Sequence, residues 1–248
     1  MQADSRSLKA KSSSIRVLAT GAPYHGLMDV LREFERATGA VAFVYKAPVG
    51  KALEVLGGCV QVDLVVLPSS AMEKARVRNW VRVSGPFVDL GGSGVGFFIG
   101  PSWEGPAPDV SYREGLMEAL EAAESIGVTD PKLGSGGRIV MNALEHLGPD
   151  DPIRRKIRLF PSGDATFKAA AEEQTMVALG LVCEGLATHG LELAGSLPPG
   201  MNQVTQYMAG MSQTVYVQNE GLVGQLLDLL KRSRQTFVAH GLDEEPDQ

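Results

Sequence analysis

The sequence contains only two cysteines, Cys59 and Cys183, and no run of 18 apolar residues. The cysteines lack the spacing of a metal motif, so we expect two buried free thiols, with a single disulfide as the alternative. The four histidines are scattered, with no pair at the spacing of a helical zinc site, so neither a metal nor another cofactor is expected. Without a long apolar run, no membrane-spanning helix is predicted.

Positive charge is also scarce. There are 23 lysines and arginines against 29 aspartates and glutamates, which gives a net charge of −6. A chain this acidic gains nothing from phosphate backbones, so no nucleic-acid partner is expected. Residues 1–14 are polar and lack the apolar core of a secretory signal, which predicts a disordered tail and a cytoplasmic protein, or a periplasmic one if a signal has been removed.

Strand and helix patterns alternate along the rest of the chain. Apolar runs at 15–19 and 41–45 flank a segment with helical spacing, and the polar segment 46–51 that follows is predicted to be a loop. The run VDLVVL at 62–67 is almost continuously apolar, which is typical of a strand buried on both faces of a parallel sheet. The alternation predicts an α/β fold with mostly parallel sheet.

Segment 129–138 is the strongest candidate binding feature, because a predicted strand runs into Gly-Ser-Gly-Gly and then a helix. Free N–H groups and the helix dipole at such a start attract anions. We expect Gly136 and Gly137 to let a ligand approach the backbone, Ser135 to donate its hydroxyl, and Arg138 to pair with a carboxylate. An ordinary capped helix with Arg138 in solvent is the alternative.

Several other loops follow predicted strands, and ligands of open α/β sheets bind beyond the carboxyl ends of the strands. Lys51 and Arg138 would then be two cations that face one cleft from opposite sides. His25 follows the first such loop, and helix packing is its alternative role. The further residues that we assign to the anion site are Thr20, Gly21, Ala22, Val49, Gly50, Lys51, Ser69, Ser162 and Tyr207.

The order of these segments resembles the molybdate-binding protein family of solute-binding proteins, over nearly the whole chain after residue 15. The matching stretches are IRVLATGAPYHGLMDVLREFERATGA (15–40), VDLVVLPSS (62–70), SIGVTDPKLGSGGRIVMNALEHLG (125–148), LAGSLPPGMNQVTQYMAGM (193–211) and the closing HGLDEEP.

The resemblance implies the type II periplasmic-binding-protein fold, in which two lobes are joined by two crossovers and the ligand lies between them. Lobe 1 would comprise 15–92 and 204–248, and lobe 2 would comprise 93–203. The glycine cluster 91–96, for which a plain surface turn is the alternative, and the stretch 198–205 would form the hinges.

The resemblance also implies a ligand site, and here the sequence departs from the family. Loop serines that hold the oxyanion in molybdate binders fall on or near Ala22 and on Val49-Gly50. With Lys51 and Arg138, this loss favours an organic carboxylate over molybdate. We therefore predict a solute-binding protein that closes on a small anion, with transporter membrane subunits as partners if it is exported.

A branch of the family that is similar to aconitate isomerase suggests a second hypothesis. That reaction moves a double bond by a proton shift, which requires a general base and stabilisation of the charge that develops on a carboxylate. The candidate bases are His25, Lys51 and Glu184. The alternative function is therefore a cytoplasmic isomerase of a small unsaturated carboxylate.

Overall fold

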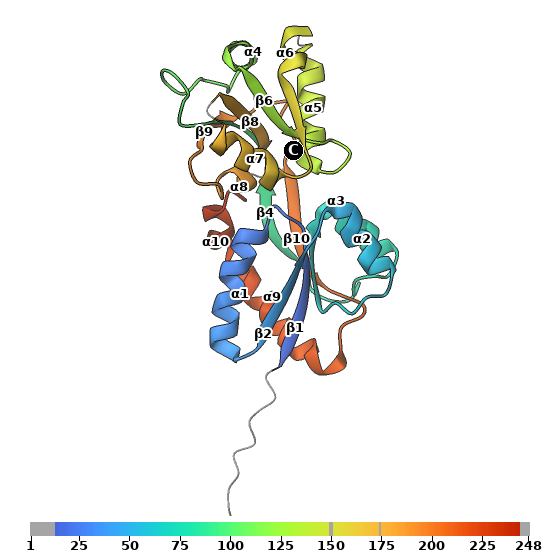
Figure 1. Cartoon of the computed structure of the whole chain (residues 1–248). Coiled ribbons are helices and arrows are strands. Elements are labelled where there is room, and N and C mark those ends of the chain that lie inside the picture. The colour runs from blue at the N-terminus through green and yellow to red at the C-terminus, as the bar shows by residue number, and fades with distance from the viewer. Residues whose placement is uncertain (1–12, 149–150, 174, 244–248) are drawn as a thin grey trace, which may run out of the picture.

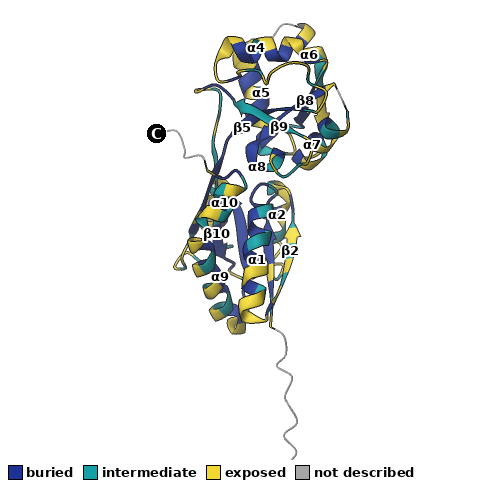
Figure 2. Cartoon of the chain, turned by 90° about the vertical axis from the view of Figure 1, so that its left-hand side faces the viewer, coloured by how far each residue is buried: buried dark blue, intermediate teal, exposed yellow. Residues whose placement is uncertain are grey.

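The computed structural model describes residues 13–148, 151–173 and 175–243, and it consists of two lobes, each built on a five-stranded sheet flanked by helices (Figure 1). Apolar side chains fill the interior of both lobes, while exposed residues cover the outer helix faces (Figure 2). Most of the predicted tail 1–14, and residues 244–248, lie outside the described residues. Among the described residues, no helix is both long and apolar enough to cross a membrane.

The sheet of the first lobe has the strand order β2-β1-β3-β10-β4. Strands β1, β2 and β3 pair in parallel, and β10 is antiparallel to both β3 and β4. All five residues of β3 are buried, as the apolar run predicted. The strands are β1 (Ser14–Ala19), β2 (Val41–Lys46), β3 (Leu64–Pro68), β4 (Val88–Ser93) and β10 (Thr205–Met211).

Helices cover both faces of this sheet. Alternate residues of β1 and β3 point to opposite faces, so one face packs against α1 and α9 and the other against α2 and α3. The helices of this lobe are α1 (Tyr24–Thr38), α2 (Val49–Gly57), α3 (Ser69–Val77), η1 (Val217–Asn219), α9 (Glu220–Arg232) and α10 (Arg234–Ala239).

The sheet of the second lobe has the order β7-β6-β8-β5-β9, with β6 parallel to β7 and β8, and β5 antiparallel to β8 and β9. Its strands are β5 (Val95–Ile99), β6 (Ser125–Thr129), β7 (Ile157–Phe160), β8 (Met176–Leu181) and β9 (Glu192–Ser196). Its helices are α4 (Arg113–Ala122), α5 (Ser135–Leu147), α6 (Asp151–Lys156), α7 (Gly163–Glu172) and α8 (Val182–Gly185).

The chain passes between the sheets where β4 leads into β5 and where β9 leads into β10. The glycine cluster 91–96 therefore lies in two strands and not in a surface turn. Gly91 has φ +102°, and a Cβ there would lie 2.2 Å from the Arg234 guanidinium, so only glycine fits. The predicted lobe boundaries at 92/93 and 203/204 stay predictions.

Three local expectations are corrected by the structure. The predicted loop 46–51 ends early, because α2 begins at Val49. The Gly-Ser-Gly-Gly turn is helical from Ser135 onward, with Gly134 as the N-cap. Both cysteines are free, as expected, but only Cys183 is buried, and Cys59 is exposed.

Candidate functional site

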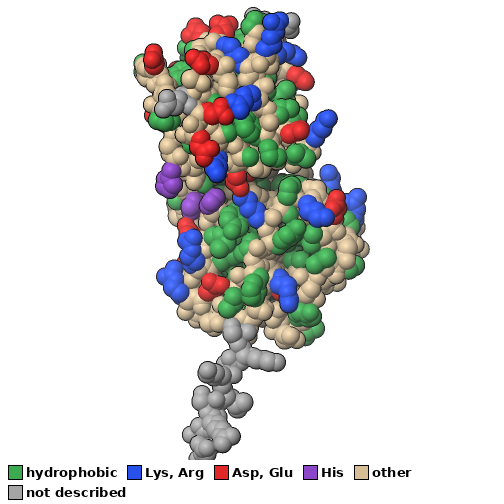
Figure 3. Space-filling model, viewed as in Figure 1, with side chains coloured by type: hydrophobic (Ala, Val, Ile, Leu, Met, Phe, Trp, Pro, Cys, Tyr) green, Lys and Arg blue, Asp and Glu red, His purple; other side chains and the backbone are tan. Residues whose placement is uncertain are grey.

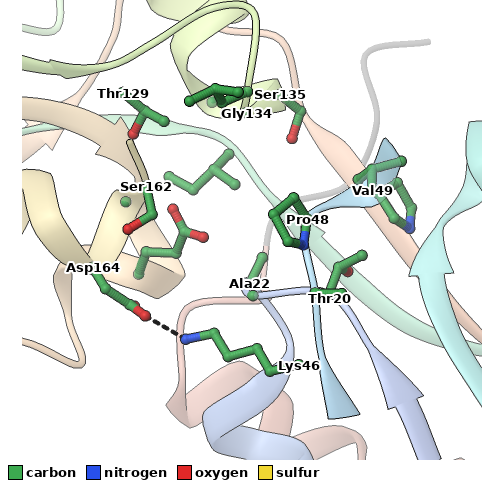
Figure 4. A pocket seen from close by; sticks show the side chains of 18 of the residues that line it. Thr20, Ala22, Lys46, Pro48, Val49, Thr129, Gly134, Ser135, Ser162 and Asp164 are labelled. Atoms are coloured by element: carbon green, nitrogen blue, oxygen red, sulfur yellow. Dashed lines mark hydrogen bonds and ion pairs between the residues drawn. The ribbon is translucent and has the colours of Figure 1, made fainter. Parts of the chain in front are cut away.

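A pocket of about 270 Å³ lies between the two lobes, and both lobes contribute to its wall (Figure 4). The residues around it follow the carboxyl ends of β1, β2 and β3 in one lobe and of β6, β7 and β8 in the other. This is where the topology of open α/β sheets places ligands. Its volume lies just below the usual range for small-molecule sites, which begins at about 300 Å³.

Three helices begin at this pocket, α2 from the first lobe and α5 and α7 from the second, and α7 is capped by Ser162, whose Oγ accepts from the Ala165 N–H. Pro48 and Val49 bring the start of α2 to the wall, and Gly134 and Ser135 bring the start of α5. None of the described side chains caps α2 or α5. Because the first-turn N–H groups of a helix have no acceptor within the helix, both ends offer hydrogen-bond donors and positive potential to the pocket.

Thr20, at the end of β1, contributes an unsatisfied hydroxyl. Its residue is 3% exposed, and its Oγ1 has no hydrogen-bond partner among the described residues. A buried polar group without a partner costs about 1–3 kcal/mol. A ligand atom in the pocket would satisfy it.

Tyr207 and Ser135 connect the lobes, since they share a side-chain hydrogen bond between β10 and α5. Burial, followed by the proximity of Cys183 and Glu184, raises the pKa of Tyr207 well above its ordinary value. The phenol therefore stays protonated and orients Ser135 at the start of α5.

A second interlobe contact joins Lys46 at the end of β2 to Asp164 in α7. The Lys46 Nζ lies 2.5 Å from Asp164 Oδ2 (Figure 4). It also lies 4.9 Å from the centre of the Tyr24 ring. The charge of Lys46 is thus already paired before any ligand arrives.

Glu184 lies next to this pair, in α8. Burial raises the pKa of its carboxyl to about 7, and the negative charge of Asp164 adds to that effect while Lys46 opposes it. A Cβ at Gly163 would lie 2.0 Å from Glu184 Oε2, so the carboxyl occupies the space that this glycine leaves open. An acid of this kind in a cleft is a candidate functional group.

The structure brings nine of the residues assigned from the sequence to the pocket wall: Thr20, Gly21, Ala22, Val49, Ser135, Gly136, Ser162, Glu184 and Tyr207. Six others are not in this wall: His25, Gly50, Lys51, Ser69, Gly137 and Arg138. Their positions on the helices explain why.

The two expected cations do not meet in the cleft. Lys51 is exposed on α2, with its Nζ 3.0 Å from Glu54 Oε2, and Arg138 is exposed on α5. Gly137 serves packing, because a Cβ there would lie 2.0 Å from the Thr129 carbonyl oxygen. The expectation of paired cations at the ligand is corrected accordingly.

The remaining three assignments, His25, Gly50 and Ser69, also lie on helices outside the wall. His25 is half-buried on α1, stacked on His240 at 6.4 Å, and burial followed by Lys46 lowers its pKa. Ser69 and Gly50 belong to helix starts but lie outside the wall. Of the three candidate bases, only Glu184 is in the wall.

Sequence reasoning left eleven residues of the pocket wall unassigned. They are Lys46, Ala47, Pro48, Pro68, Thr129, Leu133, Gly134, Pro161, Gly163, Asp164 and Leu181. Lys46 and Thr129 are the last residues of their strands, so the rule that pointed to the loops would have found them if it had included the strand ends.

These features define a two-lobed α/β binding protein with an anion-attracting pocket between its lobes. The chain matches the bacterial extracellular solute-binding protein family over residues 15–243 and belongs to that family. Among curated proteins, it is 24% identical over 208 residues to an aconitate isomerase of a Pseudomonas species, covering 80% of this chain and 76% of that protein.

Solved structures confirm the predicted type II periplasmic-binding-protein fold. The periplasmic molybdate-binding protein of Azotobacter vinelandii superposes with a TM-score of 0.74 at 13% identity, over 93% of this chain and 99% of that one. The substrate binding domain of a putative molybdenum ABC transporter from Clostridium difficile gives 0.71 at 13% identity, over 94% and 100%. At 13% identity, these similarities show that the fold is shared and nothing about the ligand.

Proposed function

We propose that this protein binds a small organic carboxylate in the interlobe pocket. The observation that carries the proposal is the meeting of two uncapped helix N-termini, α2 and α5, from opposite lobes at one pocket. The buried, unpartnered Thr20 hydroxyl in the same wall supports a ligand there independently. Closure of the lobes would complete the donor set around the anion.

In this arrangement the carboxylate accepts hydrogen bonds from backbone N–H groups rather than from a cation. Ser135 and Gly136 are in the first turn of α5, and Val49 is in the first turn of α2. Short charge-assisted bonds from N–H groups to an anion are stronger than neutral ones. Membership of the solute-binding family supports a binding role, and molybdate binding by the Azotobacter protein supports an anionic ligand.

The preference for a carboxylate over a tetrahedral oxyanion rests on size and charge. A pocket of about 270 Å³ has room for a ligand larger than a single molybdate, such as a di- or tricarboxylate. Ala22 and Val49 supply no hydroxyl at the two loops, and Glu184 adds an acid to the wall.

Thermal-shift and calorimetric titrations test this proposal, with succinate, malate, citrate, sulfate, molybdate and tungstate as probes. A ligand at 100 times its Kd stabilises the folded state by about 2.7 kcal/mol, so binding raises the melting temperature. We expect at least one carboxylate to do so. Stabilisation by molybdate or tungstate, with no response to carboxylates, contradicts the proposal.

For an exported form of the protein, we propose the membrane subunits of a transporter as the partner. The support is the family and the description of the Clostridium difficile relative as a transporter domain. Co-purification with membrane subunits encoded by the same organism is the direct check, and a ligand-dependent increase is the expected result.

A second candidate function is favoured by one specific observation, the pKa of about 7 of Glu184 in the pocket. General bases work best when their pKa lies near the working pH. Ionised Glu184 would remove a proton from a carbon next to a carboxylate, the helix N-termini would stabilise the resulting charge, and the proton would return at the far carbon of the original double bond. The similarity to aconitate isomerase supports this reaction.

Incubation with cis- and trans-aconitate in deuterated water tests the second candidate. The expected result is interconversion with deuterium incorporation, abolished by Glu184→Gln. Binding of aconitate with neither interconversion nor exchange rejects the enzyme for that substrate and leaves the binding function standing.

A further inference from the structure

Glu184 is unusual because its carboxyl lies against both lobes. A Cβ at Gly21, in the first lobe, would be 3.0 Å from Glu184 Oε1, and one at Gly163, in the second, would be 2.0 Å from Oε2. No side chain or N–H group among the described residues donates a hydrogen bond to this carboxyl or forms an ion pair with it. The group is therefore an unpaired acceptor in the pocket wall.

The side chains of Glu184 and Asp164 place acceptors on one side of the pocket, next to the paired Lys46 and the start of α7, whose Ser162 cap already takes the Ala165 N–H. Asp164 lies on this side, and its partner Lys46 has no second carboxylate within ion-pair distance in the described part of the chain. Figure 4 shows Asp164 and Ser162 on one side of the pocket, and Thr20 and Val49 on the other.

The other side of the pocket is rich in donors. The uncapped start of α2 and the orphaned hydroxyl of Thr20 are there, and the start of α5 adjoins them. A ligand that satisfies both sides needs an anionic group at one end and a hydrogen-bond donor at the other. A plain anion satisfies only the donors.

We propose that Glu184 is a specificity-determining residue that selects carboxylates bearing a hydroxyl group, whose O–H it accepts while the ligand carboxylate is held at the starts of α2 and α5. This inference rests on the proposed carboxylate-binding function and narrows it to hydroxycarboxylates. Burial raises the pKa of Glu184 to about 7, so the carboxyl is ionised and accepts this hydrogen bond at pH 8, where the titrations are made.

Above pH 7, where Glu184 is ionised, the same geometry disfavours fully deprotonated tetrahedral oxyanions. Molybdate and sulfate offer acceptors only, so their oxygens would face the Glu184 carboxylate without a proton between them. Like charges without an intervening donor repel strongly in a pocket that is partly shielded from water. A neutral amide at this position would remove the repulsion and add a donor.

Matched ligand pairs isolate the hydroxyl group. Malate differs from succinate by one hydroxyl, and citrate differs from tricarballylate in the same way. A hydrogen bond to a charged group predicts that the full-length protein binds the hydroxylated member of at least one pair about tenfold tighter or more in calorimetric titrations.

Variants then assign this preference to Glu184. Glu184→Met keeps the length but removes the acceptor, and we expect the preference to shrink to about twofold or less. Glu184→Gln should strengthen molybdate binding by about tenfold. Gly163→Ala should reduce the preference as well, because the three atoms nearest to the added methyl group all belong to the flexible end of Glu184, which it displaces.

Glu172→Gln is the matched control. It neutralises an exposed glutamate in the same lobe, at the far end of α7 and about 14 Å along that helix from Gly163. It should change neither the hydroxyl preference nor molybdate binding. Far-UV circular dichroism establishes that each variant is folded before titration.

The outcomes separate this inference from the function on which it rests. Preference for the hydroxylated ligands that is lost in Glu184→Met and Gly163→Ala supports it. Equal binding within both pairs, or a preference that Glu184→Met retains, overturns the inference and leaves carboxylate binding intact. If no carboxylate binds the wild-type protein, the proposed function and this inference fall together.

Discussion

Replacement of Glu184 by glutamine should remove a pH-dependent loss of stability. The ordinary pKa of a glutamate is 4.5, and burial with the nearby charge of Asp164 raises that of Glu184 to about 7 in the folded protein. Between these two values the folded state keeps a proton that the unfolded state has released. The free energy of unfolding therefore falls as pH rises through this window, and it is constant with respect to this group above pH 7.

The size of the effect follows from the two pKa values. Each unit corresponds to 1.36 kcal/mol, so a difference of about 2.5 units gives a loss of roughly 3 kcal/mol between pH 4.5 and pH 7, as an upper value. Glu184→Gln carries no titrating group there. The free energy of unfolding of the variant minus that of the wild type should be near zero at pH 4.5 and rise to roughly 3 kcal/mol at pH 8.

Urea denaturation at half-unit intervals from pH 4.5 to 8.5 measures this difference. All other titrating groups are common to both proteins, so their contributions to the stability difference cancel unless they interact with Glu184. The groups that do interact with it are Asp164, Lys46, Cys183 and Tyr207. Asp164→Asn should lower the pH at the midpoint of this stability change, because it removes the charge that repels ionised Glu184 and frees Lys46 to stabilise it. A stability difference that does not vary with pH would refute the placement of Glu184 as a half-buried, unpaired acid.

Three further changes test other parts of the site. Thr20→Val should weaken ligand binding about tenfold by calorimetry yet leave thermal stability unchanged or slightly higher, because the hydroxyl lacks a protein partner. Lys46→Met should unpair Asp164 and increase the radius of gyration of the ligand-free protein in X-ray scattering, and an unchanged radius contradicts a role in closure. Lys51→Ala and Arg138→Ala should change affinity less than twofold, and a tenfold loss for either would return that cation to the site.

The fold could be predicted from the sequence because its signals are local and repeated. The apolar run at 62–67 predicted the fully buried strand β3. The order of the later segments predicted the two lobes, each with its own sheet. The rule that ligands lie beyond the carboxyl ends of strands also brought the right loops together. That rule depends on topology alone, so it holds although no single motif is specific.

The side chains within those loops could not be predicted, because their direction depends on where each helix begins. Helix α2 begins at Val49, so Lys51 is turned by about 200° from Val49 and points into solvent. Arg138 lies beyond the first-turn N–H groups of α5. The pairing of Lys46 with Asp164 joins residues 118 positions apart, which no local pattern reveals.

With no unpaired cation found in the wall of the pocket among the described residues, recognition of an anion falls to backbone N–H groups and hydroxyls. On the face seen in Figure 3, basic and acidic side chains are interspersed, so no broad positive surface guides the ligand either. Such a site discriminates by geometry and by the balance of donors and acceptors rather than by charge.

Glu184 then determines both proposed functions. An unpaired, half-buried acid lowers the stability of the ligand-free protein, and such local violations of good packing and pairing are expected where a protein has a function to perform. A ligand whose hydroxyl faces the carboxyl is held, whereas a ligand whose acidic C–H faces it can lose a proton. Binding and isomerisation thus differ in which ligand atom meets Glu184, and deuterium exchange in a bound carboxylate separates them even if both kinds of ligand bind with equal affinity.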